Sequence, residues 1–476
     1  MQAKEQNFLV SIGLEIHAQL KTQSKLFSPD RAGFNPGENQ EIHPVSLALP
    51  GTLPVLNEEA LKMAFKTGKA VQGCLKKKSV FSRKNYFYPD LPKGYQISQY
   101  DKPFCEGGFI QFFHKNQEIS IALERIHIEE DAGRSLHKGN FSLINYNRAG
   151  TPLLEIVTKP VISDPYVASQ CVKAIRRLLR YLEVCDGNLE EGSMRCDCNI
   201  SVRPEGQKQL GAKVELKNIN SFRFIEKALF YEKARQIECL KLGQALTQET
   251  RLYDSTKNQT KSMRSKESAR DYRYFPDPDL PELDVSENFL NQLDLPELPF
   301  DKTQRFVKEY KFTPDLAQIL VEDFKQADYF EQVVLQTKNP QALSLWFRGE
   351  IQAHLKEKNQ RVCPIPVKDF ARLLNLIDEG DISNTMAKDI FSEMWNQAKS
   401  PDQIIKEKNL KQISSDSKLK AFAQDVLNQN PKQVQDYKQG RSKLFGFFIG
   451  QVMKKTKGQA NPQKLSHILK QLLEDC

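Results

Sequence analysis

Apolar and polar residues alternate with a period of two in four segments of the first half of the chain, and this pattern predicts β-strands. Alternate side chains of a strand point to opposite faces, so each segment has one core face and one polar face. Two segments with helical spacing interrupt the strands. One follows Asp164 and Pro165, a capping residue and a first-turn proline, and the other spans residues 222–242. The predicted strands cover residues 10–20, 119–130, 153–158 and 194–202.

Helical spacing begins near residue 300 and continues to the end of the chain, after a proline-rich junction at 293–306. We therefore predict an α+β protein whose 476 residues form three domains. These are a large mixed, β-rich domain (1–297), an all-α helical domain (298–408) and a small helical tail domain (409–476). Polar residues 254–269 predict a loop. Residues 271–283 predict extended chain, because proline disfavours helix at the preceding residue.

The polar face of the first predicted strand carries Glu15 and His17, two residues apart. A carboxylate and an imidazole on one strand face can bind a divalent cation or transfer protons. An ordinary solvent-facing surface would have the same residues, so both interpretations stay open for this strand alone.

The second predicted strand changes phase, with apolar residues at odd positions up to 123 and at even positions from 126. This change predicts a β-bulge, which often re-aims side chains near a site. Glu129, Glu130 and Asp131 follow, and adjacent carboxylates repel one another unless a cation or basic groups compensate. The pattern favours either a metal site or an exposed acidic turn.

The strand predicted at 194–202 places Cys196 and Cys198 on its core face as buried thiols. Arg195, Asp197 and Asn199 share the other face, where charges and an amide would suit a polyphosphate and its Mg²⁺. The chain contains no phosphate-loop or dinucleotide glycine motif and no nucleophile elbow. Motifs alone therefore do not identify an ATP site.

Residues 83–101 combine four tyrosines with two lysines, one arginine and two prolines. Aromatic rings interleaved with cations fit a surface that stacks on or wraps a large anionic ligand. A proline-rich loop whose tyrosines lie against the core is the alternative.

The formal net charge of +9 is concentrated near the C-terminus, where residues 431–476 hold nine Lys and Arg against three acids. A basic terminal module predicts a polyanionic partner, although a solvated helix face is the alternative. Nine cysteines without CxxC pairs predict reduced thiols in a cytoplasm. No signal or transit pattern begins the sequence, and no apolar run reaches the length of a membrane helix.

Several long motifs resemble the B subunit of the bacterial tRNA-dependent amidotransferases. They are IGLEIHAQLKT (12–22), RKNYFYPDLPKGYQ (83–96), IHIEEDAGRSLH (126–137), NRAGTPLLEIV (147–157), EEGSMRCDCNISVRP (190–204) and KGQANPQ (457–463). The resemblance implies a β-rich cradle domain and an ATP- and Mg²⁺-dependent ligase that amidates Glu-tRNA(Gln), Asp-tRNA(Asn) or both. It also implies two protein partners, the amidase (glutaminase) A subunit together with the small C subunit.

The resemblance assigns roles residue by residue. Glu15, His17 and Glu130 are expected as catalytic Mg²⁺ ligands, with Glu129 and Asp197 as weaker candidates. Lys84 and Lys93 are expected to contact phosphate or guide ammonia. Arg195, Asp197 and Asn199 are the expected nucleotide-binding residues. In the basic tail, Lys454, Lys455 and Lys457 are expected to bind the tRNA body in a salt-sensitive way.

One segment departs from the family. Many relatives have a cysteine quartet patterned FCxC and CPVC that resembles a structural zinc site. This chain has FSPD and HPVS there, with Ser28, Asp30, His43 and Ser46 in place of the cysteines. Structural zinc prefers thiolates, so we predict no zinc.

Two other functions fit parts of the sequence. A non-catalytic tRNA-binding scaffold explains the basic tail and the aromatic segment, but does not require Glu15, His17 and Glu130 to converge. A small-molecule ligase resembling the ATP-grasp enzymes explains the acids but not the basic tail.

Overall fold

The computed structural model of the protein describes residues 7–33, 37–265, 272–337, 339–408, 410, 415–456 and 459–475. The chain forms two compact units. The first runs to Phe306 and includes Thr313–Gln318; the second contains Val307–Phe312 and the chain from Ile319 onward. The predicted α+β class is confirmed, since a strand-rich part is followed by a helical part. The domain boundaries placed at 297 and 408 stay predictions.

One large mixed sheet organises the first unit. Its strands are β1 (Phe8–Gln19), β2 (Cys74–Leu75), β4 (Ser82–Asn85), β5 (Tyr95–Ser98), β6 (Cys105–Glu106), β7 (Phe109–His114), β8 (Gln117–Glu130), β11 (Pro152–Thr158), β12 (Met194–Pro204), β13 (Val214–Lys217), β14 (Glu249–Asp254), β15 (Gln259–Ser265) and β16 (Phe275–Pro276). The main path is β15-β14-β13-β12-β1-β11-β8-β5-β4-β16, with β2, β6 and β7 attached beside it. Two small sheets pair β9 (Arg134–Lys138) with β10 (Phe141–Asn145) and β17 (Leu283–Asp284) with β3 (Lys78–Ser79).

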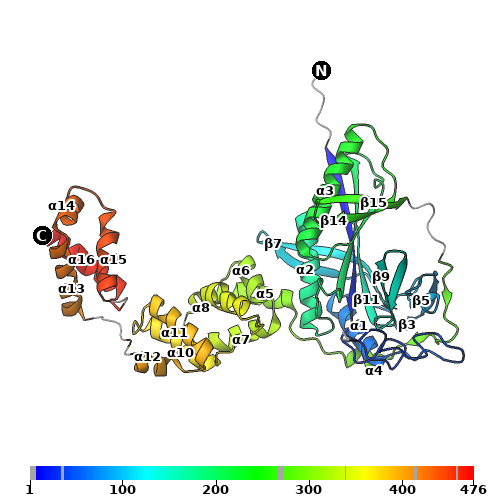
Figure 1. Cartoon of the computed structure of the whole chain (residues 1–476), viewed down its shortest axis with the longest axis horizontal. Coiled ribbons are helices and arrows are strands. Elements are labelled where there is room, and N and C mark those ends of the chain that lie inside the picture. The colour runs from blue at the N-terminus through cyan, green and yellow to red at the C-terminus, as the bar shows by residue number, and fades with distance from the viewer. Residues whose placement is uncertain are drawn as a thin grey trace, which may run out of the picture. The chain divides into compact units, whose positions relative to one another are not determined.

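Helices pack against this sheet. They are α1 (Glu58–Ala70), α2 (Pro165–Tyr181) and α3 (Phe222–Lys241), whereas α4 (Glu287–Asn291) contacts α1 through the rings of Phe289 and Phe65. α2 and α3 lie side by side on one face (Figure 1). Asp164 caps α2 by accepting a hydrogen bond from the Tyr166 N–H, and Pro165 occupies the first turn. The two helices predicted from the sequence are therefore confirmed.

β1 lies at the centre of the sheet, hydrogen-bonded in antiparallel fashion to β11 on one side and to β12 on the other. Its apolar residues Ile12, Leu14, Ile16 and Ala18 are buried in the core. The register sets His17 opposite Glu155 of β11 and opposite Arg195 of β12. Side chains from three strands are thereby brought together at one place on the sheet.

The β-bulge predicted in the second strand is present. The register of β8 against β11 shifts between Val157, which faces Arg125, and Thr158, which faces Leu123. Glu124 is the extra residue, so the alternation changes phase at this point. His127 and Glu129 follow on β8 and are buried.

The prediction of a loop at 254–269 is wrong at Asp254, the last residue of β14, and over residues 259–265, which form β15 and pair with β14. Thr260 is buried, and its hydroxyl donates to the carboxylate of Glu232 on α3 at 2.8 Å. Arg251 of β14 donates to the same hydroxyl at 2.9 Å. A buried polar network therefore replaces the apolar alternation on which the sequence pattern depends. Residues 266–269 lie outside the described ranges.

The remaining helices continue from the end of the sheet. They are α5 (Pro299–Tyr310), α6 (Pro314–Leu320), α7 (Phe324–Val334), α8 (Pro340–Trp346), a π-helical turn (Phe347–Ile351), α9 (Gln352–Glu357), α10 (Val367–Asp378), α11 (Asn384–Gln397), α12 (Pro401–Lys408), α13 (Asp416–Gln429), α14 (Pro431–Lys438), α15 (Leu444–Lys455) and α16 (Pro462–Asp475). Leu419, Phe448 and Leu469 belong to the apolar core that joins α13, α15 and α16. Among the helices described, none has the length and apolar content needed to cross a membrane.

Candidate functional site

A cluster of carboxylates and imidazoles lies where β1, β8 and β11 meet. His17 Nε2 is 3.4 Å from Glu155 Oε2, 3.6 Å from Glu129 Oε1 and 3.8 Å from Glu15 Oε1. On the neighbouring strand, His127 Nε2 is 3.2 Å from Glu155 Oε2 and 3.7 Å from Glu129 Oε2. These five residues, Glu15, His17, His127, Glu129 and Glu155, are called the carboxylate–imidazole cluster below.

Within this cluster the ligand atoms form two overlapping groups with metal-binding spacing. One contains Glu15, His17 and Glu155, and the other contains His127, Glu129 and Glu155. Glu155 is the residue common to both. Its position on the buried strand β11 fixes its carboxylate between the two imidazoles.

The charges in the cluster compensate one another. Against the effect of burial, Glu155 and then Glu129 raise the pKa of His127 to about 9. Against the same effect, Glu155 and the neighbouring carboxylates raise the pKa of His17. The two imidazoles in turn hold the pKa of the buried Glu155 well below its ordinary value. Without a metal the His127 imidazole is therefore protonated near neutral pH, and the neighbouring carboxylates shift His17 toward its protonated form. A bound cation would displace these protons.

The donor set fits a divalent cation. Carboxylate oxygens are the ligands that Mg²⁺ and Mn²⁺ prefer, and a neutral imidazole is a common additional ligand. Burial supports the same interpretation, because three neighbouring carboxylates, two of them buried, have few other compensating groups beside the two histidines. Arg125 lies 3.9 Å from Glu155, and the Ser98 hydroxyl donates to Glu129 at 3.3 Å.

The predicted residues divide into those inside and those outside this cluster. Glu15, His17 and Glu129 are inside. Glu130 belongs to neither ligand group found in the described part of the chain; its carboxylate pairs with Lys93 and accepts the Ile97 N–H at 2.8 Å. The structure thus places Glu130 and Lys93 together.

Lys84 and Asp197 also lie outside the two ligand groups. The Lys84 ammonium lies over the Tyr272 ring at 5.0 Å and the Tyr86 ring at 5.9 Å. The Asp197 carboxylate is paired with Lys217 at 2.5 Å. Its charge is therefore already compensated by a lysine.

His127 and Glu155 were missed by the sequence reasoning. Glu155 is a lone acid in the apolar run LLEIV, which is an unusual residue for a buried strand. His127 precedes Glu129 by two residues and so shares its strand face. Both signals are visible in the sequence, although neither shows which strands are neighbours.

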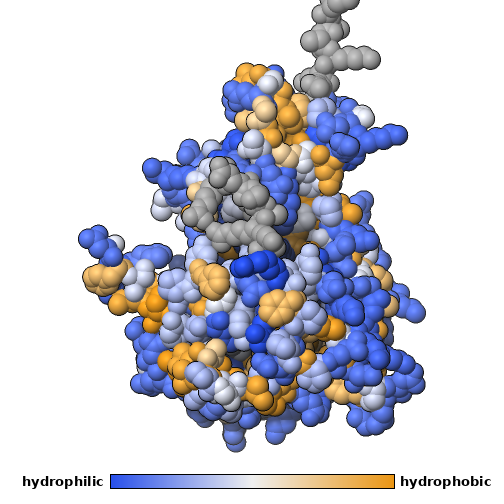
Figure 2. Space-filling view, turned by 90° about the vertical axis from the view of Figure 1, so that its right-hand side faces the viewer, coloured by the Kyte–Doolittle hydropathy of each residue, from blue (hydrophilic) through white to orange (hydrophobic). Residues whose placement is uncertain are grey.

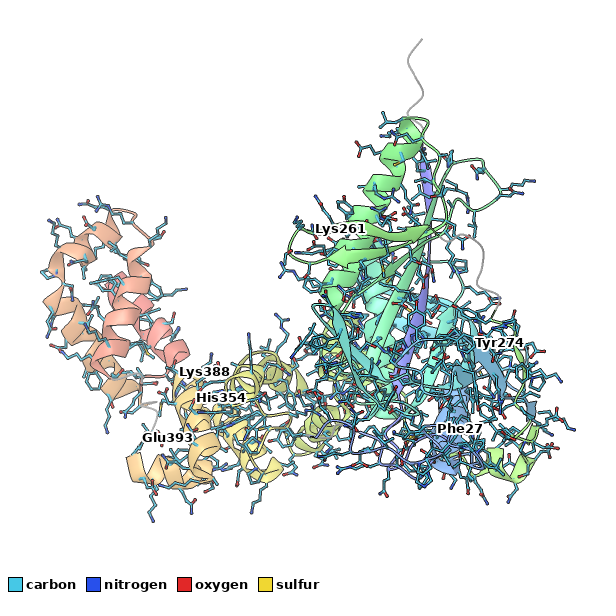
Figure 3. The ribbon with its side chains drawn as sticks, turned by 45° about the vertical axis from the view of Figure 1, so that its right-hand side comes forward. Phe27, Lys261, Tyr274, His354, Lys388 and Glu393 are labelled. Atoms are coloured by element: carbon cyan, nitrogen blue, oxygen red, sulfur yellow. The ribbon has the colours of Figure 1, made fainter. Side chains whose placement is uncertain are left out.

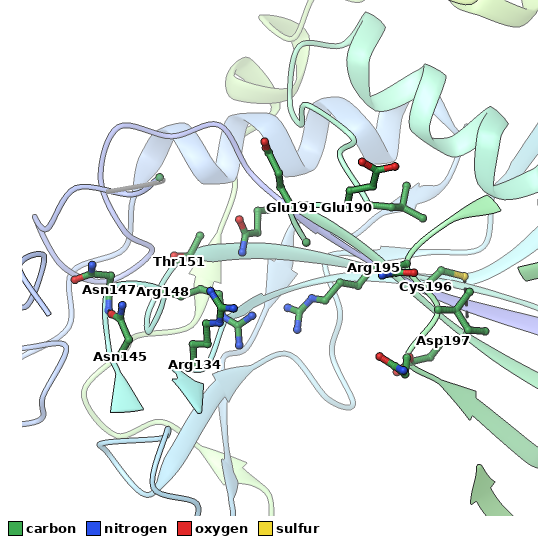
Figure 4. A pocket seen from close by; sticks show the side chains of 17 residues that line it. Arg134, Asn145, Asn147, Arg148, Thr151, Glu190, Glu191, Arg195, Cys196 and Asp197 are labelled. Carbon is green, nitrogen blue, oxygen red and sulfur yellow. Dashed lines mark hydrogen bonds between the residues drawn. The ribbon is translucent and has the colours of Figure 1, made fainter. Parts of the chain in front are cut away.

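Next to the cluster is a cavity of about 630 Å³. Arg134, Arg148 and Arg195 extend toward the same space (Figure 4). Asn145, Asn147, Thr151, Asn218 and Asn220 add hydrogen-bonding groups, Glu190 and Glu191 add carboxylates, and Gln19, Gly33, Leu189, Gly192, Cys196, Asp197 and Ile219 complete the lining. Three arginines around one cavity favour an anionic ligand.

Asp131 holds two of these arginines in place. Arg195 Nη2 is 2.8 Å and Arg148 Nε is 3.5 Å from Asp131 Oδ2. Against the effect of burial, the two guanidinium groups lower the pKa of Asp131. Arg195 Nε is buried without a hydrogen-bond partner among the described residues, so a donor is left for a ligand.

The predicted nucleotide-binding residues have different positions. Arg195 and Asp197 line the cavity, whereas Asn199 is not among its lining residues. The Asn199 Oδ1 atom is buried and makes no hydrogen bond within the described ranges. In the tail, Lys455 pairs with Asp425, Lys454 is exposed at the end of α15, and Lys457 lies outside the described residues.

The segment that differs from the cysteine pattern forms a polar cluster around a buried lysine. Lys25 Nζ is 3.3 Å from Asp30 Oδ2, and the hydroxyls of Ser28 and Ser46 both contact this carboxylate. His43 Nδ1 accepts the N–H of Val45 at 3.3 Å. An ammonium beside the carboxylate and the lack of thiolates make this set unsuited to zinc, and the expectation of no zinc stays a prediction.

Comparison with known proteins places the chain in a class. The family model described as the GatB/GatE catalytic domain matches residues 10–291, and the model described as the GatB domain matches residues 328–473. The chain therefore belongs to the GatB family. The recognition made from sequence motifs is confirmed.

Relatives align along nearly their whole length. A protein of Bdellovibrio bacteriovorus is 49% identical over 97% of this chain and 98% of its own length. A protein of Thermodesulfovibrio yellowstonii is 46% identical over 98% of this chain and 99% of its own length. A protein of Persephonella marina is 45% identical over 97% of this chain and 99% of its own length. Each is named as the B subunit of an aspartyl/glutamyl-tRNA(Asn/Gln) amidotransferase.

Proposed function

We propose that the chain is the subunit of a carbon–nitrogen ligase that amidates the side chain of the amino acid on Glu-tRNA(Gln), Asp-tRNA(Asn) or both. ATP is the phosphoryl donor, and ammonia comes from glutamine through an amidase partner. The observation that carries the proposal is the carboxylate–imidazole cluster beside an arginine-lined cavity. A kinase site needs a divalent cation and fixed positive charge at one place.

The proposed chemistry has two steps. An oxygen of the substrate carboxylate attacks the γ-phosphorus of ATP, the bond to ADP breaks, and an acyl phosphate forms. Ammonia then attacks the acyl carbon, inorganic phosphate leaves, and the nitrogen loses a proton. Activation is necessary because a carboxylate is a poor electrophile, whereas phosphate is a good leaving group.

Residues of the chain have separate tasks in these steps. Glu15, His17, Glu129 and Glu155 would hold Mg²⁺, which neutralises phosphate charge when bound. Arg195 and Arg148 would orient the ATP phosphates, since Asp131 fixes their guanidinium groups before the ligand arrives. Lys93, paired with Glu130, would bind the phosphate or receive the proton from ammonia.

We propose further that the enzyme acts in the cytoplasm on tRNA, in a complex with the amidase A subunit, together with the small C subunit. The names of the relatives support this, because each is called the B subunit of a tRNA amidotransferase. A non-catalytic scaffold would have no use for three buried or half-buried carboxylates converging on two imidazoles.

The test uses the chain co-purified with its amidase partner, supplied with Glu-tRNA(Gln), Mg²⁺ and γ-labelled ATP, with and without ammonia. Phosphate release that depends on charged tRNA, followed by amide formation when ammonia is added, is the expected result. Tight tRNA binding without ATP cleavage by the competent complex would contradict the proposal and favour the scaffold.

Replacing an arginine of the cavity should weaken ATP binding specifically. We expect Arg195→Met to raise the KM for ATP by about tenfold to 100-fold, since a charge-assisted hydrogen bond contributes about 1.5–3 kcal/mol. Arg203→Met on the same strand is the matched control, because Arg203 does not line the cavity, and its KM should stay near the wild-type value. Equal effects of the two changes would contradict ATP binding in this cavity.

Neutralising the tail lysines should weaken tRNA binding and flatten its salt dependence. For the triple change of Lys454, Lys455 and Lys457 to Gln, the slope of log K against log[salt] should fall by about 0.9 for each phosphate that the tail no longer neutralises. Lys454→Gln alone should have a larger effect than Lys455→Gln, because Asp425 already compensates Lys455. An unchanged slope in filter-binding titrations would count against tRNA binding by the tail.

A further inference from the structure

Five tyrosines form a continuous file at one edge of the large sheet. Successive ring centroids are 6.1 Å apart from Tyr88 to Tyr86, 6.0 Å from Tyr86 to Tyr272 and 6.1 Å from Tyr272 to Tyr274. Tyr274 then stacks on Tyr100 at 4.0 Å with only 6° between the ring planes. The rings come from residues 86–100 and 272–274, so two distant segments build one feature, which we call the tyrosine file.

The ends of the file are open to solvent. Tyr88 is 46% exposed and Tyr100 is 58% exposed, and Phe87, which precedes Tyr88 in sequence, is 80% exposed. A core feature would bury these rings, whereas a binding surface leaves their faces available. Exposure therefore excludes the simple alternative that the aromatic segment only packs against the core.

A lysine accompanies the rings. Lys84 lies over Tyr86 and Tyr272, and in the described part of the chain its ammonium has no ion pair. This contrasts with Arg83, whose guanidinium is held by Asp277 and Asp279. Aromatic faces beside an uncompensated cation are the combination that binds single-stranded nucleic acid, through base stacking and attraction of phosphate.

The file lies next to the carboxylate–imidazole cluster. β5 pairs with β8 at Ser98 and Glu129, and Gln96 donates to the backbone carbonyl of Glu130 at 2.6 Å. The Tyr86 hydroxyl contacts the same Gln96 side chain at 3.4 Å. Tyr274 lies beside the blue strands of this edge (Figure 3). If an acyl group were held at the cluster, the nucleotide chain that carries it would therefore run along the tyrosine file.

Hydrophobic side chains on the face of the molecule that lies at the right of Figure 1 form several separate groups among hydrophilic ones (Figure 2). A stable interface with another protein usually has a more continuous apolar centre. Rings with hydroxyl groups and a nearby cation fit nucleotides better than they fit an apolar protein surface.

We propose that the tyrosine file stacks the unpaired bases at the 3′ end of the charged tRNA and so positions the aminoacyl group at the cluster. The proposal rests on the proposed function, because that function brings an aminoacylated 3′ end to this place. The tyrosines are positioning residues: they bind the bases that precede the reacting ester and do not take part in bond making.

The test measures stacking directly. The complex with its amidase partner is titrated with a tRNA that has 2-aminopurine in place of its 3′-terminal adenine. The fluorescence should be quenched strongly by the wild type and by Tyr274→Phe, which keeps the ring. It should be quenched little by the double variant Tyr100→Ala/Tyr274→Ala. Stacking on the file would explain this difference, since the hydroxyl contributes little and the ring contributes most.

A second arm uses tRNA that lacks its last three nucleotides. Removing them should weaken wild-type binding by about fivefold or more, and should hardly change binding to the double variant. Phe230→Ala, an exposed ring on α3, is the matched control and should behave as the wild type in both arms. Thermal melting of the variants checks that they fold.

Three outcomes distinguish the alternatives. Equal loss of affinity for intact and truncated tRNA in the double variant would overturn the proposal. If the double variant lost the amidase partner during purification, this would also overturn the proposal and would assign the tyrosine file to a protein interface. Normal quenching without ATP cleavage would support the file while contradicting the proposed function, so the two failures are distinguishable.

Discussion

Glu155→Gln should reduce ATP cleavage dependent on charged tRNA by about 100-fold or more, a loss typical of disturbed metal sites. Glu155 is the one residue shared by both groups of possible metal ligands, and its carboxylate lies 3.4 Å from His17 and 3.2 Å from His127. Glutamine preserves the volume and one oxygen but removes the charge. Binding of Mg²⁺ or Mn²⁺, measured by calorimetry on the complex, should weaken in parallel.

Glu130→Gln is the matched control for metal binding. Glu130 follows Glu129 in sequence, but its carboxylate is engaged by Lys93 and the Ile97 N–H. Its loss should leave the metal affinity within about twofold of the wild-type value, whatever its effect on amide formation. Glu15→Ala and His17→Ala should abolish amidation while tRNA binding persists. If Glu130→Gln weakened metal binding more than Glu155→Gln does, the result would contradict the assignment of the cluster as the metal site.

Lys25→Met should destabilise the sheet-bearing unit by about 3 kcal/mol, because removing one partner of a buried ion pair leaves an uncompensated charge. The Lys25 side chain is fully buried, lies 3.3 Å from Asp30 and donates to the Glu41 carbonyl at 2.8 Å. The double variant Lys25→Met/Asp30→Asn should recover much of the loss, since the unpaired charge is then removed as well. Calorimetric melting of the full chain measures both changes.

Lowering the pH should reduce the difference in the free energy of unfolding between the wild type and Lys25→Met. Against the effect of burial, the Ser46 hydroxyl, the His43 backbone N–H and Lys25 lower the pKa of Asp30 below its usual 3.8. A carboxyl group whose pKa is lowered by folding contributes stability at pH values above its pKa in the unfolded chain. This contribution disappears as the pH falls through its pKa in the folded protein. A variant as stable as the wild type at neutral pH would show that the pair contributes nothing. Zinc at one ion per chain would contradict the interpretation of this segment.

Much of the fold could be predicted because its signals are local. The alternation of β1 and β12 identified which side chains face the core, including the thiols of Cys196 and Cys198, and both are buried. The change of phase in β8 located the bulge at Glu124. The cap at Asp164 located the start of α2. Each signal depends on a few neighbouring residues.

The rest of the site depends on which strands are neighbours. Glu155 lies opposite His17 only because β11 pairs with β1 in one register, and a shift of one residue would turn it to the other face. The pairing of Glu130 with Lys93 likewise requires β5 to lie beside β8. The strand at 259–265 was mistaken for a loop because its buried partner is the carboxylate of Glu232, which no hydrophobic pattern reveals.

The central position of β1 has a consequence for synthesis. The strand leaves the ribosome before its partners β11 and β12, which begin only at Pro152 and Met194. Until then this strand of 12 residues, which has one apolar face, has unpaired edges, and this is a risk for aggregation. Contacts of such high sequence separation form slowly. We therefore expect the nascent chain to depend on chaperones until β12 has been made.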